Sequence, residues 1–203
     1  MNLTAEDRAR RIKVLIFDVD GVLTDGQLFF LPENSGQPGP DGKLRGLEFK
    51  GFTAHDGLGI TLARLAGLRV GLITKRESAT VAIRAQDLKL EFVYQGQSRK
   101  MDAVDDILIR AGITLDELAY VGDDVVDLPV MRVCGLSIAT ANARIQAKTA
   151  AHYITPNPGG HGAGRDAIDF ILAAQGKLDG AIEDFLDRDN PAAALADIGS
   201  GKM

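Results

Sequence analysis

The chain has 203 residues, of which 45% are hydrophobic and 25% are charged, and its formal net charge is −5. This length and composition are those of a globular protein with a sizeable core, and they predict a single domain over residues 1–190. The negative net charge argues against nucleic acid or an anionic membrane as the main partner.

The cysteine content and the first residues bear on the cellular compartment. Cys134 is the only cysteine, so no internal disulfide can form, which fits a reducing environment. Residues 1–11 are polar and charged, without the apolar core of a signal peptide, and no apolar run approaches the ~18 residues of a membrane span. We therefore expect a cytoplasmic protein.

The first apolar run, residues 14–17, predicts a buried strand that ends in two carboxylates, Asp18 and Asp20. Gly21 allows the chain to turn there, so that both carboxylates converge on one point. Oxygens about 4 Å apart would repel each other by roughly 4 kcal/mol at an effective dielectric near 20, so such a pair needs a cation. Aspartates are also common in turns at strand ends, and Asp-x-Asp alone is a weak motif.

Residues 26–50 predict a β-hairpin inserted after this strand. The runs 27–31 and 45–49 are apolar or alternating, and the Gly- and Pro-rich connector between them predicts a long, flexible tip. The hairpin is too small to bury apolar side chains such as Phe29 and Phe49, which need cover from the body or from another subunit.

Beyond the hairpin, strands and helices alternate along the chain. Strands are expected over residues 69–73, 92–94, 118–121, 135–138 and 152–154. Helices are expected over residues 58–66, 77–86, 100–110 and 142–149, and a last helix, opened by the segment 159–164, is expected to run to about residue 174. This alternation predicts an α/β fold, with a doubly wound, mainly parallel Rossmann-like sheet and helices on both faces. The Ala- and Gly-rich tail, residues 191–203, is expected to be flexible.

Four polar residues follow the ends of predicted strands. Asp18, Thr74, Lys100 and Asp123 each lie just past the carboxyl end of a strand, the edge of an open parallel sheet at which ligands bind. Singly, Thr74 is typical of a strand-end turn, Lys100 of a solvated helix position, and the aspartates of a helix start. Their coincidence at one edge predicts a catalytic site.

These stretches resemble the haloacid dehalogenase superfamily of phosphohydrolases, and in particular its cap-less branch that acts on 3-deoxy-D-manno-octulosonate 8-phosphate. The superfamily motifs are Asp18-Val19-Asp20-Gly21, Thr74, Lys100 and Gly122-Asp123-Asp124-Val125-Val126-Asp127. The branch is indicated by residues 18–26, 55–57, 94–98, 120–127 with 129–131, 159–163 and 174–179. The resemblance covers roughly residues 12–180.

The resemblance implies a role for each catalytic residue. Asp18 would be the nucleophile that forms an aspartyl-phosphate, and Asp20 would protonate the leaving alkoxide and then activate water. Thr74 would donate its hydroxyl to a phosphate oxygen, and Lys100 would offset the developing negative charge.

The resemblance also implies a Mg²⁺ site, and an all-oxygen donor set suits this ion. The ligands would be Asp18, the backbone carbonyl of Asp20, and Asp123. Asp127 would support them from outside, by orienting Lys100 or a metal-bound water.

Substrate contacts are implied in two segments, one before and one after Thr74. They are Thr53, Ala54, His55, Asp56, Gly57, Arg76 and Arg84. An arginine suits a sugar-acid carboxylate because its planar fork binds bidentately. On sequence grounds alone, Arg84 is equally typical of a surface charge on a helix.

Three positions depart from the branch and leave alternatives open. Lys75 replaces a glycine, and His55 and Thr61 stand where arginines are common. These changes indicate an altered anion geometry or another sugar acid, such as a nonulosonate 9-phosphate. A catalytically idle sugar-phosphate-binding protein is a further alternative, but a binder has no need of an acid at Asp20.

The resemblance finally implies partners. The substrate would be a small sugar-acid phosphate used in lipopolysaccharide precursor synthesis, and the chain would form a homotetramer through the hairpin. No nucleic acid or membrane partner is expected.

Overall fold

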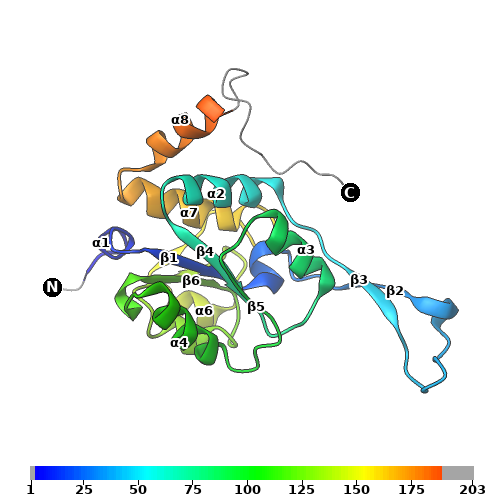
Figure 1. The fold of residues 1–203 in the computed structure, drawn as a ribbon. Coiled ribbons are helices and arrows are strands. Elements are labelled where there is room, and N and C mark those ends of the chain that lie inside the picture. The colour runs from blue at the N-terminus through cyan, green and yellow to red at the C-terminus, as the bar shows by residue number, and fades with distance from the viewer. Residues whose placement is uncertain (1–2, 189–203) are drawn as a thin grey trace.

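A six-stranded parallel sheet lies at the centre of the computed structural model, which describes residues 3–188 (Figure 1). Its order is β5-β4-β1-β6-β7-β8. The strands are β1 (Val14–Phe17), β4 (Arg69–Ile73), β5 (Phe92–Tyr94), β6 (Leu118–Gly122), β7 (Leu136–Ala139) and β8 (Tyr153–Ile154). This confirms the predicted doubly wound α/β fold, whereas the tail 191–203 lies outside the described residues.

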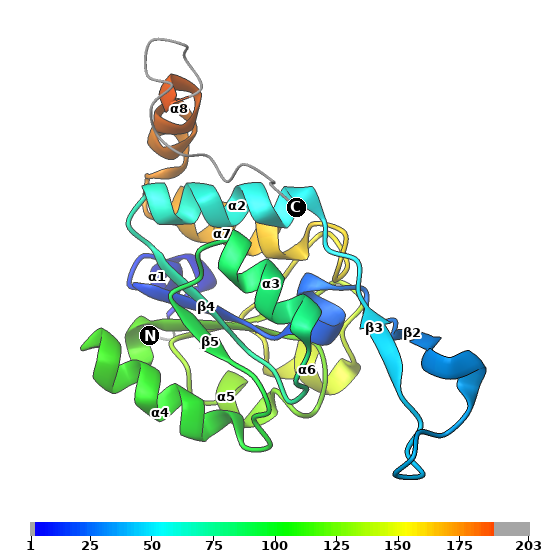
Figure 2. The same ribbon diagram turned by 45° about the vertical axis from the view of Figure 1, so that its right-hand side comes forward.

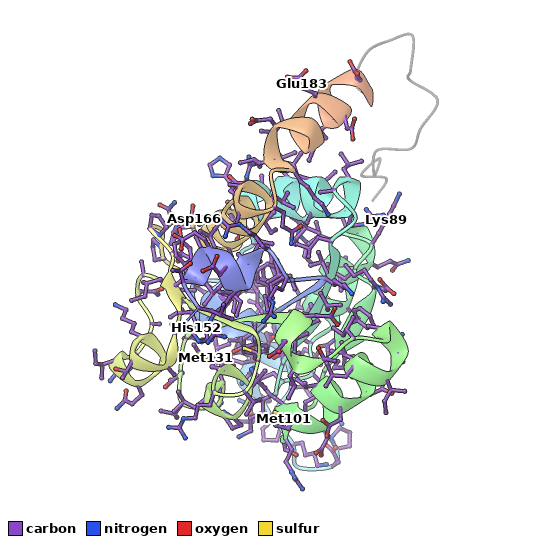
Figure 3. The ribbon with its side chains drawn as sticks, turned by 90° about the vertical axis from the view of Figure 1, so that its left-hand side faces the viewer. Lys89, Met101, Met131, His152, Asp166 and Glu183 are labelled. Atoms are coloured by element: carbon purple, nitrogen blue, oxygen red, sulfur yellow. The ribbon has the colours of Figure 1, made fainter. Side chains whose placement is uncertain are left out.

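Helices cover both faces of the sheet, so alternate residues of each central strand enter different cores (Figures 1 and 2). Leu15 and Phe17 of β1 pack against one set of helices, and Val14 and Ile16 against the other. The first set is α1 (Ala5–Ala9), α2 (Ala54–Leu65), α7 (Ala163–Ala174) and α8 (Leu178–Arg188), with α3 (Ala79–Asp87) packed nearby. The second set is α4 (Lys100–Ala111), α5 (Leu128–Met131) and α6 (Ile145–Ala150). Met131 lies within this second core (Figure 3).

The strand order reverses at β1, which pairs with β4 on one side and β6 on the other. The chain fills one half of the sheet with β4 and β5 and then crosses β1 to build the other half. A crevice forms outside the carboxyl ends of the strands at such a switch point. Asp18, the residue after β1, is therefore placed at its centre.

The predicted hairpin is present as β2 (Phe29–Pro32) and β3 (Gly46–Phe49), joined through the short 3-10 helix η2 (Glu33–Gly36). The two strands are antiparallel, with Phe29 opposite Phe49, and they extend away from the body (Figures 1 and 2). Their side chains are almost all exposed. The flexibility of the tip stays a prediction.

One helix begins earlier than predicted. α2 starts at Ala54 rather than near residue 58, because the Thr53 hydroxyl accepts from the backbone N–H of His55 at 3.3 Å and caps it. Gly57 and Gly59 lie within this helix, where a glycine allows close packing: a Cβ on Gly59 would lie 2.9 Å from Cδ of Arg165 in α7.

Three helices, α1, α5 and α8, were not predicted. Thr4 and Asp7 form a reciprocal capping box that starts α1. Among the helices of residues 3–188, none combines the length and the apolar character that crossing a membrane requires.

Candidate active site

The predicted catalytic residues meet in one cleft at the carboxyl edge of the sheet. Asp18 follows β1, Thr74 follows β4, Lys100 opens α4 and Asp123 follows β6. The cleft is lined by Asp18, Asp20, Gly21, Asp25, Gly26, Thr74, Lys75, Arg76, Lys100, Asp123, Asp124, Val126 and Asn142. Segments separated by about a hundred positions in the sequence thus contribute to a single site.

Lys100 is buried between two carboxylates rather than exposed on its helix. Its Nζ lies 2.9 Å from Asp18 Oδ1 and 2.7 Å from Asp127 Oδ1, and it also donates to the Tyr120 hydroxyl at 2.9 Å. Burial alone would lower the pKa of Lys100, but the charges of Asp18 and Asp127 outweigh it and raise that pKa. The ammonium is therefore charged and is held directly beside Asp18.

Asp127 shapes the loop that follows β6. Its Oδ2 accepts from the backbone N–H of Asp123 at 2.9 Å and of Asp124 at 3.2 Å, while Oδ1 accepts from Tyr120 and Lys100. Both oxygens of this fully buried carboxylate are thus occupied. Asp127 holds Asp123 and Lys100 in place at the same time.

The site carries more negative charge than its own lysine offsets. Oxygens of Asp18, Asp123 and Asp127 lie within 4.8 Å of one another. Burial, and after it the charge of Asp127, raises the pKa of both Asp18 and Asp123 to about 7. Three clustered carboxylates are a donor set that hard divalent cations prefer, so these residues fit a Mg²⁺-type ion.

Gly21 lets the backbone after Asp20 approach this cluster. Its φ is +91°, and a Cβ built on it would lie 2.3 Å from Asp123 Oδ2, so only glycine fits. Gly159 packs against this turn in the same way, since its Cβ would lie 1.9 Å from the Gly21 carbonyl oxygen. The glycine-rich segment before α7 thus packs closely against the turn that contains Gly21.

The side chain of Asp20 lies in the same cleft and pairs with basic residues other than Lys100. It forms an ion pair with Lys50 Nζ, and its Oδ2 lies 3.8 Å from Arg76 Nε. Lys50 and Arg76 also pair with Glu48 of the hairpin, at 3.3 Å and 2.8 Å. The carboxylate of Asp20 is therefore held by cations at the base of the hairpin.

Lys50 was missed by sequence reasoning, although its side chain is only 1% exposed. The alternation of Glu48, in β3, and Lys50, the residue after β3, was the available signal, since residues two apart in an extended chain share a face. It placed both residues on one face without showing that this face meets the turn after β1.

The structure separates the predicted substrate contacts into two groups. Arg76 lines the cleft, and Thr74 beside it is buried and accepts from the Arg76 backbone N–H at 3.3 Å. Thr53, Ala54, His55, Asp56, Gly57 and Arg84 do not line it. Arg84 instead pairs with Asp87 at 2.5 Å and packs against Gly57.

Asp56 binds the start of α7. Its Oδ1 accepts from the Arg165 backbone N–H at 2.8 Å, while its Oδ2 is buried without a hydrogen-bond partner. Burial, with a further contribution from Asp166, raises the pKa of Asp56 to about 6. A carboxyl whose pKa is higher in the folded state costs stability once the pH exceeds its unfolded value.

We expect Asp56→Asn to raise the free energy of unfolding by about 1–3 kcal/mol near pH 8, because the amide keeps the Oδ1 acceptor and removes the buried charge. The gain should shrink as the pH falls through about 6 toward 4, where the wild-type carboxyl takes up a proton. Urea unfolding of the variant and the wild type at pH 8 and at pH 4 measures this gain in the free energy of unfolding. A higher KM with unchanged unfolding would instead support substrate contact.

Comparisons with known proteins agree with this geometry. Residues 72–164 match the haloacid dehalogenase-like hydrolase family. The chain is 41% identical over 174 residues to 3-deoxy-D-manno-octulosonate 8-phosphate phosphatase KdsC of Escherichia coli (strain K12), covering 86% of each chain. It is 38% identical over 172 residues to the same-named protein of Haemophilus influenzae, covering 85% of this chain and 89% of that one.

Solved structures give the same relationship. The crystal structure of 3-deoxy-D-manno-octulosonate 8-phosphate phosphatase from Yersinia pestis has a TM-score of 0.77 and 39% identity, covering 87% of this chain and 89% of that one. The phosphatase from Moraxella catarrhalis, in complex with magnesium, phosphate and KDO, has a TM-score of 0.78 and 35% identity. That match covers 89% of this chain and 97% of the other.

Proposed function

This chain belongs to the haloacid dehalogenase-like hydrolases and is a phosphatase of their cap-less branch, and we propose that it hydrolyses 3-deoxy-D-manno-octulosonate 8-phosphate with Mg²⁺. The convergence of Asp18, Thr74, Lys100 and Asp123 on one cleft carries the proposal. The names of the relatives support the substrate and a place in lipopolysaccharide precursor synthesis.

In the proposed first step, an Asp18 carboxylate oxygen attacks phosphorus. A P–O bond to Asp18 forms, the P–O ester bond breaks, and Asp20 gives its proton to the departing alkoxide. Lys100 stands 2.9 Å from Asp18 Oδ1 and offsets negative charge on the transferring group, and the Thr74 hydroxyl donates to a phosphoryl oxygen.

In the second step, water attacks phosphorus and Asp20 accepts its proton. The P–O bond to Asp18 breaks, which releases phosphate and restores the free carboxylate. Arg76 and Lys50 flank Asp20 and keep its side chain at the cleft during both steps.

Mg²⁺ would be held by Asp18, Asp123 and the backbone carbonyl of Asp20, with Asp127 fixing Asp123 through its backbone N–H. When bound, the ion supplies positive charge beside the phosphate oxygens. The raised pKa values of Asp18 and Asp123 support such a site, because a bound cation would favour the charged carboxylates that burial, and after it the charge of Asp127, disfavours.

A phosphate-release panel tests the proposal. We expect Mg²⁺-dependent release from 3-deoxy-D-manno-octulosonate 8-phosphate, with much lower kcat/KM for a nonulosonate 9-phosphate and for simple sugar phosphates. A higher kcat/KM for the nonulosonate 9-phosphate would identify that sugar-acid phosphate as the substrate instead. No release from any ester, with Mg²⁺ present, would favour a catalytically idle binder.

The apolar hairpin supports a homotetramer. Phe30 and Leu47 are 55% and 62% exposed, and the stacked rings of Phe29 and Phe49, 5.3 Å apart, are 42% and 48% exposed. Burying such a surface favours association of copies through the hairpin. A monomeric mass by light scattering would contradict this assembly.

We propose that residues 1–190 form one domain with residues 26–50 as an inserted hairpin. The lone buried Cys134, which precludes an internal disulfide, supports a cytoplasmic location.

A further inference from the structure

The cleft contains three cationic side chains, and two of them are already neutralised by the protein. Lys100 lies between Asp18 and Asp127. Arg76 donates to Glu48 at 2.8 Å and lies 3.8 Å from Asp20. Neither is available as an unpaired positive charge for a second anionic group.

Lys75 is the third cation, and it differs from the other two. It lines the same cleft and is exposed, yet it makes no hydrogen bond or ion pair with any residue between 3 and 188. In the sequence it lies between Thr74, the proposed hydrogen-bond donor to the phosphate, and Arg76. Lys75 thus contributes a positive charge to the cleft that the proposed phosphate-binding residues do not use.

The proposed substrate has an anionic group that this machinery leaves unmatched. A sugar-acid phosphate carries a phosphate at one end and a carboxylate at the other. Lys100 and a divalent cation at the aspartate cluster would offset the phosphate, but five acidic residues of the cleft, Asp18, Asp20, Asp25, Asp123 and Asp124, would repel the carboxylate.

We propose that Lys75 binds the carboxylate of the sugar acid and so selects acidic sugar phosphates over neutral ones, an inference that rests on the proposed function. A lysine presents a compact charge on a flexible stem, which suits a carboxylate remote from the reacting atoms. Because the contact forms equally in the ground and transition states, it lowers KM and leaves kcat unchanged.

The test compares Lys75→Met with the wild type on two esters of primary alcohols, 3-deoxy-D-manno-octulosonate 8-phosphate and D-arabinose 5-phosphate, of which only the first carries a carboxylate. For the sugar acid, KM should rise about fivefold at constant kcat, as expected for loss of one partly exposed ion pair. For arabinose 5-phosphate, kcat/KM should change by less than about twofold. Lys75→Arg should restore most of the preference because it keeps the charge.

Lys148→Met serves as the matched control, since Lys148 lies on α6 and does not line the cleft. Its kinetics should equal those of the wild type on both esters. A sugar-acid preference that is undiminished in Lys75→Met, or an equal loss on both esters, would overturn the inference alone. No turnover of either ester by the wild type would overturn the proposed function, and the inference with it.

Discussion

Replacing Asp18 with asparagine is expected to lower the rate of phosphate release by at least about a thousandfold, because the amide cannot attack phosphorus or form the acyl-phosphate bond. The fold should persist. Asp18 is buried beside Asp123 and Asp127, and burial raises its pKa to about 7, so a neutral side chain of the same shape removes repulsion from the metal-free protein. Steady-state phosphate release and thermal unfolding measure the two effects.

Asp102→Asn is a matched control for this variant. Asp102 lies on α4, is exposed, and is 3.7 Å from Arg99, so the same chemical change there should alter neither activity nor melting temperature. Turnover by Asp18→Asn at the wild-type rate would refute the assignment of Asp18 as nucleophile. Loss of activity together with unfolding would mean that Asp18 is needed for structure.

Lys100→Met is expected to have the second-largest effect, on both stability and rate. The change leaves Asp18 and Asp127 buried without their ammonium partner, which costs about 3–5 kcal/mol for a buried pair broken on one side. Losing a charge aimed at the transferring phosphoryl group should also lower kcat by about a hundredfold or more.

The pH dependence of this loss follows from the pKa shifts. The raised pKa of Lys100 keeps it charged throughout the neutral range, so the protonation of its partner Asp18 sets the pH dependence of its stabilising contribution. Burial raises the pKa of Asp18 to about 7, so Asp18 is charged at pH 8 and largely protonated at pH 6, and the loss of stability in the variant should be larger at pH 8. Lys13→Met, which removes the partner of Glu117 from an exposed ion pair, is the control and should have little effect. Equal melting temperatures for Lys100→Met and wild type at pH 8 would contradict the account.

The sheet and the catalytic cleft were predictable from the sequence because both follow from local patterns. Apolar runs such as residues 14–17 mark buried strands, and a parallel sheet brings the carboxyl ends of its strands to one edge. That rule suffices to place Asp18, Thr74 and Lys100 together. No knowledge of side-chain contacts is required.

The partners of Asp20 and Asp56 were not predictable, because they depend on contacts between distant segments. Lys50 contacts Asp20 only because the residue that follows β3 lies beside the turn that follows β1. Asp56 is separated from Arg165 by 109 positions, and the hydrogen bond between them depends on how α2 packs against α7. Local propensity predicts that these helices form, but it does not predict which helices pack against each other.

We expect the phosphoryl group to be transiently bonded to Asp18 during turnover, and acid quenching tests this most directly. Wild-type enzyme mixed with substrate and Mg²⁺, quenched in acid within a single turnover and digested, should yield one peptide containing Asp18 that carries one added phosphoryl group. Asp18→Asn should yield none. A phosphoryl group on any other residue, or its absence from rapidly quenched enzyme that is releasing phosphate, would contradict the account.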